Sequence, residues 1–328
     1  MFRTLGQLVS PAGEHAKLCV LMYHRVLPQP DPILAGEIDA ELFEQHMRLL
    51  ATEFNVLPLS EGCARLVAGS LPARAAAITF DDGYSDNEQV ALPILRRLGL
   101  SATFFVSTGY SDGGVMFNDG VIEAVREAPA GEYDFTEQGL GRHVLDGSES
   151  RRLAIDRILR GLVHRAAAER RAIMERLLAE MDAALPKDLM MTPAQIAHLH
   201  REGMEIGGHT ISHPILHLLD ESQARAEIVG GKRRLEEITG APVTLFAYPN
   251  GKPGEDYGLR EVRLVQEAGF AAAVSTILGV AHRGSDPFQL PRYAAWERNQ
   301  TRLGVRLLLH CARTASQPTS APSSLRTS

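Results

Sequence analysis

The sequence predicts an α/β protein built on a parallel sheet, and three observations support this class. Short apolar runs alternate with segments that carry helix-start and helix-stop signals. Polar motifs directly follow several of the apolar runs, as expected where parallel strands end at an active-site edge. The composition, with 45% apolar and 23% charged residues in 328, is that of an ordinary globular protein. Strands that alternate with helices are normally joined by helical crossovers, so their sheet is parallel.

The expected strands are apolar runs bounded mostly by turn residues. In chain order they are CVLMYHRV from residue 19, AAAITF from 75, ATFFVST from 102, MEIGG from 204, VTLFAYP from 243 and FAAAVST from 270. Two helices between them have clear ends. One starts with Thr192 as N-cap and Gln195 completing a capping box, and the other runs from Asp220 to Gly240.

The segment from about 115 to 186 interrupts this alternation. In its second half, at 151–185, apolar residues fall near helical spacing with no strand between them, which predicts a helical insertion. Arginines outnumber acids in the stretch 151–185, which is interpreted as a solvated helix face rather than a surface for an anionic partner. We therefore expect a lead-in at 1–17, one domain at 18–300 carrying the insertion, a terminal helix at 301–315 and a disordered Ser/Thr/Pro-rich tail at 316–328.

Charge and cysteine content restrict the partners and the location. A formal net charge of -6 argues against nucleic acid as the main partner. The sequence contains no run of eighteen apolar residues, so no membrane span is predicted. The first residues lack the order of a charged, an apolar and a small-residue segment that marks a secretory signal. Three widely spaced cysteines, Cys19, Cys63 and Cys311, favour reduced thiols and a cytoplasmic location. The oligomeric state stays open.

Two neighbouring carboxylates, Asp81 and Asp82 in ITFDDGYSD, follow the second expected strand. They repel each other unless a cation lies nearby. His209 and His213 in GGHTISHP follow a later strand and are four residues apart. Two imidazoles and one carboxylate, with a position left open, form the ligand set of a hydrolytic zinc site. One aspartate could then bind the metal while the other accepts a proton from the attacking water.

Other interpretations of these residues stay open from the pattern alone. The histidines could be loop residues that cap backbone groups, and Asp-Asp-Gly is a common surface turn. The pattern does not fit the aspartate nucleophile of phosphoryl-transfer enzymes. Such a nucleophile needs a second acid two residues further on, which Gly83 and Tyr84 do not supply.

The motifs TFDDG, HTISH and YPNG together resemble the motif series of the NodB-type polysaccharide deacetylases, carbohydrate esterase family 4. The resemblance runs from about Leu18 to Trp296, with the insertion outside it, and LMYHRV is similar to the branch that acts on bacterial exopolysaccharides. It implies an irregular (β/α) barrel. It also implies metal-dependent removal of N-acetyl, sometimes O-acetyl, groups from sugars.

The resemblance implies roles for four residues. Asp81 matches the catalytic base of the family, and the metal ligands are matched by Asp82, His209 and His213. Zn²⁺ is the expected ion. The implied glycan substrate also favours a location at the cell envelope, in contrast to the cytoplasmic location that the cysteines favour.

The chain departs from the family in three places. The third family motif reads Arg-Pro-Pro-Tyr-Gly, but here Ala247 stands for the arginine that orients the base and Asn250 for the tyrosine. The backbone amide of Asn250 can still face an oxyanion. No clear Asp-x-x-Asp-Trp motif is present. LLLH resembles the Leu-x-His motif, but His310 lies in an amphipathic terminal helix and is interpreted as a bystander.

Arg292, in LPRY, is the expected substitute for the missing arginine. A guanidinium can fix the Asp81 carboxylate with two parallel hydrogen bonds. A surface arginine paired with another acid is the alternative. Arg25 is the second candidate for this substitute. Neighbouring residues of a strand point to opposite faces, so Arg25 points away from the site if His24 faces it. His24 is expected at the same edge, either in substrate contact or proton transfer or bonded to backbone.

The sequence therefore favours a metal-dependent hydrolase that deacetylates an N-acetylated polysaccharide or oligosaccharide. A non-catalytic carbohydrate-binding protein on a deacetylase scaffold is an alternative, because the motif arginine is missing. A hydrolase of another amide is a third hypothesis. The presence of the base and all three ligands favours an enzyme, whereas the polymer cannot be named from the sequence.

Overall fold

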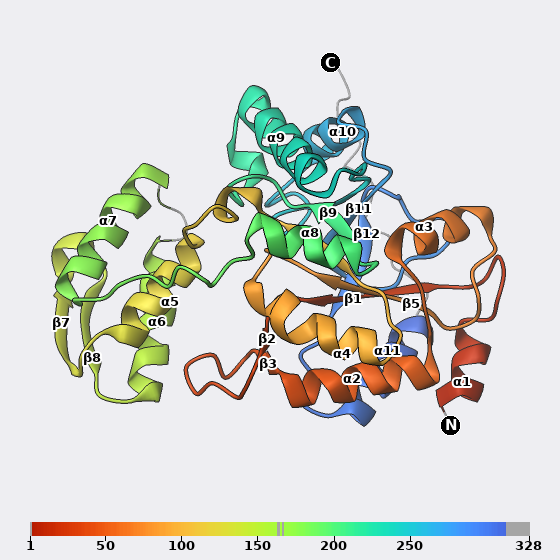
Figure 1. The fold of residues 1–328 in the computed structure, drawn as a ribbon, viewed down its shortest axis with the longest axis horizontal. Coiled ribbons are helices and arrows are strands. Elements are labelled where there is room, and N and C mark those ends of the chain that lie inside the picture. Colours follow the sequence, from red (N-terminus) through yellow and green to blue (C-terminus); the bar gives the residue numbers. More distant parts are fainter. Residues whose placement is uncertain (1, 163–164, 166, 313–328) are drawn as a thin grey trace, which may run out of the picture.

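A computed structural model describes residues 2–162, 165 and 167–312 of the chain. Seven parallel strands close into a barrel in the order β1-β12-β11-β10-β9-β6-β5, and β1 also pairs with β5 to complete the ring (Figure 1). The predicted (β/α) barrel class is confirmed. The barrel strands are β1 (Leu18–Tyr23), β5 (Ala75–Phe80), β6 (Thr103–Val106), β9 (Glu205–Gly208), β10 (Leu245–Ala247), β11 (Ala272–Leu278) and β12 (Leu290–Ala294).

The remaining strands lie outside this ring. β4 (Asn55–Val56) pairs with β5, and β2 (Val26–Leu27) pairs with β3 (Ile38–Asp39) in a small parallel sheet. One-turn helical segments occur at Asn87–Ala91, Thr108–Tyr110, Thr136–Gln138 and Leu216–Leu218.

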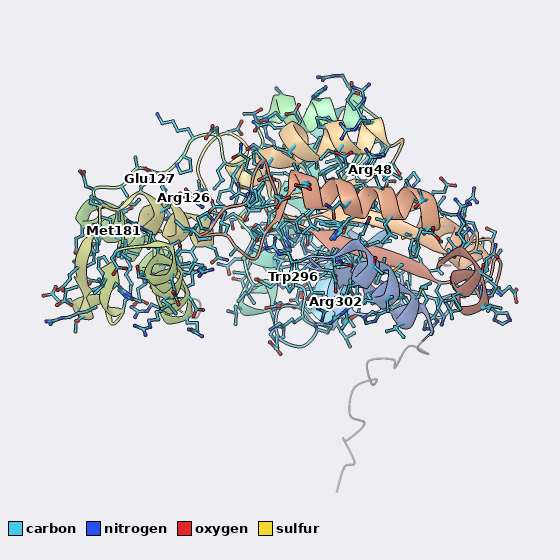
Figure 2. The ribbon with its side chains drawn as sticks, turned by 90° about the horizontal axis from the view of Figure 1, so that it is seen from below. Arg48, Arg126, Glu127, Met181, Trp296 and Arg302 are labelled. Carbon is cyan, nitrogen blue, oxygen red and sulfur yellow. The ribbon has the colours of Figure 1, made fainter. Side chains whose placement is uncertain are left out.

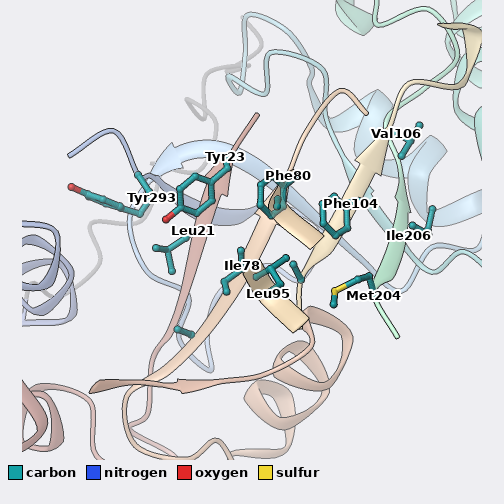
Figure 3. Packing of buried hydrophobic residues seen from close by; sticks show 14 of the residues in the cluster. Leu21, Tyr23, Ile78, Phe80, Leu95, Phe104, Val106, Met204, Ile206 and Tyr293 are labelled. Atoms are coloured by element: carbon teal, nitrogen blue, oxygen red, sulfur yellow. The ribbon is translucent and has the colours of Figure 1, made fainter. Parts of the chain in front are cut away.

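The two faces of the barrel strands pack into different cores. The outer face packs against helices, and Figure 3 shows Tyr23, Phe80 and Phe104 in a row on β1, β5 and β6. Their rings stack with centroids 5.5 and 4.7 Å apart. The inner face is richer in small side chains, as a narrow barrel requires. It includes Leu18, Val20, Ala75, Ala77, Phe105, Leu245, Ala247, Ala272, Val274 and Leu290.

Helices surround the barrel, and two of the predicted helix starts are confirmed. Thr192 and Gln195 form a capping box, as do Asp220 and Gln223, and Gly240 ends the second helix in the left-handed region. The helices of this layer are α2 (Ala40–Glu53), α3 (Leu59–Ala68), α4 (Leu92–Arg97), α8 (Pro193–Arg201), α9 (Glu221–Thr239) and α10 (Leu259–Glu267).

The two ends of the described chain lie together. The expected lead-in contains a helix, α1 (Phe2–Val9), which packs against α11 (Gln300–Ala312). The predicted terminal helix is present up to residue 312. Its last expected residues and the predicted disordered tail lie outside the described residues. The three cysteines are free thiols.

The insertion forms its own lobe beside the barrel, with a separate hydrophobic core. Figures 1 and 2, which view the molecule at right angles, both place it at one side. The predicted helices of the insertion are present, and an antiparallel hairpin that the prediction did not include joins α5 to α6. The lobe consists of α5 (Phe117–Glu127), β7 (Gly131–Phe135), β8 (Gly141–Leu145), α6 (Ser148–Leu162) and α7 (Ala167–Glu180).

Membrane-spanning helices were sought among the described residues. None of the helices there combines the length and the apolar character that crossing a bilayer requires.

Candidate metal centre and catalytic site

The two neighbouring aspartates separate at the end of β5. The Asp81 carboxylate pairs with Arg292, whereas Asp82 has φ 77° and its carboxylate lies beside His209 and His213. The next residue, Gly83, has φ 92°, and a Cβ there would lie 2.8 Å from Val106 Cγ1. Only glycine therefore fits this turn, which gives the two carboxylates different neighbours.

Asp82 faces the two predicted histidines. Its Oδ1 lies 3.4 Å from His209 Nε2 and 3.4 Å from His213 Nε2. The three ligand atoms all lie within 4.8 Å of one another. His213 and Thr210 adopt φ of 54° and 67°, so the HTISH loop holds strained backbone to aim both rings at one point. The structure thus brings the predicted ligand set together.

The hydrogen bonds around these groups fit a bound cation. His209 Nδ1 lies 2.7 Å from the carbonyl oxygen of Ala247, which can only accept, so Nδ1 carries the proton and Nε2 has a free lone pair. Asp82 Oδ1 is buried and has no hydrogen-bond partner among the described residues. A lone pair facing a buried, unpartnered carboxylate oxygen is costly unless a cation lies between them. The three residues therefore fit a divalent metal.

The charges at this point also suit metal binding. Burial favours a high pKa for Asp82, but the two imidazoles outweigh it and hold that pKa below its ordinary value. Burial lowers the pKa of His213 to about 4, so this ring is neutral at pH 7. Burial opposes protonation of His209 as well, but Asp82 and Asp81 raise its pKa above the ordinary value. Protonation of Nε2 competes with metal binding, so the affinity for a metal should fall at low pH.

Asp81 is held by Arg292, which reaches it from β12. Nη1 and Nη2 of the guanidinium lie 2.7 and 2.6 Å from the two carboxylate oxygens. Arg292 is only 1% exposed, which excludes the alternative of a surface arginine. Its Nε donates to the Ser275 carbonyl at 2.9 Å and Nη1 also reaches Thr79 Oγ1 at 3.2 Å. Burial favours a high pKa for Asp81, but Arg292 outweighs it and keeps that pKa below the ordinary value.

His24 follows β1 and lies on an open pocket of about 510 Å³ that reaches Asp82. The neighbouring Arg25 pairs with Asp86 at 2.8 Å and stacks over the Tyr84 ring at 4.9 Å, so it is not the partner of Asp81. The pocket is lined by His24, Arg25, Ala35, Gly36, Glu37, Asp82, Tyr84, Trp296 and Arg298.

A family model of polysaccharide deacetylases matches residues 68–273, a span that contains both aspartates and both histidines of the site. The chain belongs to the polysaccharide deacetylase family. This makes it a hydrolase of the deacetylase class, with a glycan substrate. A Bacillus subtilis protein, YxkH, named as a candidate polysaccharide deacetylase, is 22% identical over 279 residues, covering 84% of this chain and 71% of the relative.

Solved structures share the fold of this family member. The deacetylase PplD of Streptococcus pyogenes, in complex with acetate, superposes with a TM-score of 0.58 at 20% identity, over 85% of this chain and 92% of the other. IcaB from Ammonifex degensii gives a TM-score of 0.58 at 19% identity, over 91% and 98%. At these identities the likeness concerns the fold alone.

The departures from the family motifs have structural counterparts in this deacetylase. Ala247, where the motif has arginine, contributes its carbonyl to His209. Asn250 lies in an exposed turn with φ 58°, and its carbonyl accepts a 2.8 Å hydrogen bond from Thr276 Oγ1. It is not among the pocket-lining residues. His310 packs against the Tyr293 ring, on the outer face of β12, whereas Arg292 faces inward.

A buried contact that no sequence motif predicted joins the insertion to the segment that follows β5. Tyr84 donates its hydroxyl hydrogen to Asp119 of α5, with distances of 3.2 and 3.1 Å to the two carboxylate oxygens. Both side chains are buried. No local motif marks Asp119, because the insertion lies outside the family pattern. Burial and the negative charge of Asp82 raise the pKa of Asp119 to about 7.

This raised pKa predicts a pH-dependent gain in stability for Asp119→Asn. A carboxyl whose pKa is higher in the folded state stabilises most below its unfolded pKa and loses that contribution as pH rises through about 7. Asparagine still accepts from Tyr84 and has no charge to bury. Metal-free protein should therefore gain about 2–3 kcal/mol more from the substitution at pH 8 than at pH 5. Denaturant unfolding at both values measures this, and an equal change at both would contradict it.

Proposed function

We propose that this chain is a metal-dependent hydrolase that removes acetyl groups from an N-acetylated polysaccharide or oligosaccharide. One observation carries the proposal: Asp82, His209 and His213 converge on one point while Arg292 holds the adjacent Asp81 apart from them. A ligand set and a separate, ionised carboxylate are what hydrolysis of an acetamide needs. An exopolysaccharide substrate is proposed because LMYHRV resembles the family branch that acts on bacterial exopolysaccharides.

The metal is proposed to be Zn²⁺, bound by Asp82 Oδ1 and the Nε2 atoms of His209 and His213. Imidazole and carboxylate ligands suit this ion. When bound, it would polarise the acetyl carbonyl and lower the pKa of a water molecule. The Ala247 carbonyl supports this arrangement by fixing the tautomer of His209.

Asp81 is proposed as the general base. Because Arg292 keeps its pKa low, the carboxylate is ionised at neutral pH and can accept a proton from the attacking water. The bidentate contact also fixes the carboxylate plane, which limits the rotamers that Asp81 can adopt. The backbone amide of Asn250 is proposed to face the developing oxyanion, on the motif resemblance alone.

His24 is proposed to assist the leaving amine, because it lines the pocket beside Asp82. His24→Ala should lower kcat/KM by at least about tenfold, since proton transfer by a positioned side chain typically contributes more than that. Metal content should not change. Steady-state kinetics with metal analysis tests this, and an undiminished kcat/KM would show that His24 only bonds to its surroundings.

The alternative of a non-catalytic carbohydrate-binding protein rested on the missing motif arginine. Arg292 supplies a guanidinium to the base from another strand, which favours the enzyme. The exposed Trp296, 62% accessible at the pocket, suits a sugar substrate in either case because its ring offers a flat apolar face.

The proposed function is tested by incubating metal-loaded protein with N-acetylated and O-acetylated oligosaccharides. Release of acetate and of free amine in equal amounts from the N-acetylated series is the expected result. Folded, metal-loaded protein that is inert on both series would reject the proposal. Glycan binding without turnover would favour the binding protein, and turnover of other acetamides alone would favour another amide hydrolase.

A further inference from the structure

The loop at residues 28–37, PQPDPILAGE, forms one wall of the pocket. It connects β2 to β3 and contributes Ala35, Gly36 and Glu37 to the lining. The loop belongs to neither a helix nor a sheet, and its three prolines have no amide hydrogen to donate. Contacts with other parts of the molecule must therefore set its position.

An ion pair with the insertion is one of these contacts. Arg126 of α5 places Nη1 2.6 Å from Asp31 Oδ2 and Nε 2.9 Å from Glu123 Oε2. Ile33 of the loop also packs against the hydrophobic core of the insertion. Figure 2 shows Arg126 on the side of the lobe nearer the barrel. Arg298, which also lines the pocket, donates to the Ala35 carbonyl.

Asp31 transmits this contact to the loop backbone. Its Oδ1 accepts from the amides of Ile33 at 2.7 Å and Leu34 at 3.2 Å, while Oδ2 binds Arg126. The Leu34 carbonyl in turn accepts from the amide of Glu37 at 2.8 Å. A series of hydrogen bonds thus connects Arg126 of the insertion to Glu37, which lines the pocket. The ion pair is about one-fifth exposed on each side, so water screens it only in part.

Glu37 is the pocket residue at the end of this chain of contacts. Its carboxylate lies on the same pocket as His24 and Asp82, and it has no hydrogen-bond or ion-pair partner among the described residues. Burial raises its pKa, and the neighbouring His24 and Arg25 act in the opposite direction. An unpartnered carboxylate on a pocket wall is a ready acceptor for hydroxyl groups.

We propose that Arg126 is a positioning residue for glycan binding: through Asp31 it fixes the loop at 28–37, so that Glu37 accepts hydrogen bonds from sugar hydroxyl groups in the pocket. The proposal rests on the proposed function for its glycan. It assigns to the insertion a role in substrate affinity. The metal ligands and Asp81 are untouched by these contacts, so the chemical step should not depend on them.

Kinetics of the metal-loaded enzyme provide the first test. Arg126→Ala and Asp31→Asn should each raise KM for N-acetylglucosamine oligomers roughly tenfold with little change in kcat, which is about 1.4 kcal/mol of binding. Asparagine keeps the acceptor for the loop amides and removes the ion pair. The double variant should resemble either single one, because both remove the same contact. Arg126→Lys, which keeps a charge, should recover part of the affinity.

A matched control lies in the same lobe. Arg142 pairs with Asp134 at 2.8 Å within the β7–β8 hairpin, and neither residue lines the pocket. Arg142→Ala removes an arginine and an ion pair of the insertion, and KM should stay unchanged. A KM increase as large as that of Arg126→Ala would mean that the stability of the lobe, not the loop contact, matters, and would overturn the proposal.

A binding measurement separates this proposal from the proposed function. Trp296 is the single tryptophan of the chain and lines the same pocket, so its fluorescence reports occupancy without turnover. In an Asp81→Asn background, Arg126→Ala and Glu37→Gln should each weaken the Kd for N-acetylglucosamine oligomers roughly tenfold, but Arg142→Ala should not. Equal Kd values in all variants, or no binding by the parent, would overturn the inference. If the Kd values change as expected but wild-type protein releases no acetate, the proposed function is rejected and the role of Arg126 in glycan binding is retained.

Discussion

Asp81→Asn is expected to lower kcat by about 10²–10⁴-fold while the bound metal stays at the wild-type level. Asparagine has nearly the same shape but cannot accept the proton of the attacking water. The Asp81 carboxylate pairs with Arg292, whereas the Asp82 carboxylate lies 3.4 Å from both Nε2 atoms. Elemental analysis of purified variants, together with kinetics, measures both quantities.

The three ligand variants are the controls for this prediction. Asp82→Ala, His209→Ala and His213→Ala should each lower metal content and activity together, because each removes one of three donors that lie within 4.8 Å of one another. Equal metal loss in Asp81→Asn and Asp82→Ala would show that the roles of the two aspartates have been assigned wrongly.

Arg292→Lys is expected to impair catalysis by tenfold or more in kcat, with metal content unchanged. An ammonium cannot form two parallel hydrogen bonds, so Asp81 would lose its fixed plane. Each tenfold loss corresponds to about 1.4 kcal/mol of transition-state stabilisation. Kinetics with metal analysis measures the effect. Arg283→Lys, in an exposed pair with Glu14, is the control and should retain full activity.

Removing the guanidinium entirely should also destabilise the fold. Arg292→Met leaves Asp81 buried without its partner. Breaking a buried ion pair in this way lowers the free energy of unfolding by about 3–5 kcal/mol. Because Arg292 lowers the pKa of Asp81, this stabilisation is present above the unfolded pKa of the carboxyl and is lost as pH falls. The difference in unfolding free energy between wild type and Arg292→Met should therefore shrink towards pH 3. A difference that does not depend on pH would contradict this.

Much of the site was predictable because its residues lie in short motifs at strand ends. Asp81 and Asp82 follow a buried apolar run, and two glycines precede His209, so local sequence placed them at one edge of the barrel. Arg292 could be inferred only from a requirement, namely that a base next to a cation needs a fixed orientation. The structure places its guanidinium in contact with Asp81, whereas its effect on turnover stays a prediction.

The remaining features depend on contacts that no local pattern encodes. Asp119 meets Tyr84 across 35 residues, and Arg126 meets Asp31 across 95, so both arise only when the insertion packs beside the barrel. The hairpin was missed because most β7 side chains are exposed, which weakens the apolar alternation. The left-handed conformations of Asp82 and His213 are likewise imposed by surrounding structure, since neither residue type requires them.

The most direct test of this account is acetate release from N-acetylglucosamine oligomers by one protein sample that is chelated and then reconstituted. Activity should disappear on chelation and return in proportion to Zn²⁺ added, reaching its maximum near one ion per chain. His213→Ala, carried through the same cycle, should show little activity at that stoichiometry because the site has lost a ligand. Undiminished acetate release by the metal-free protein would contradict the account, because the site formed by Asp82, His209 and His213 would then have no part in the reaction.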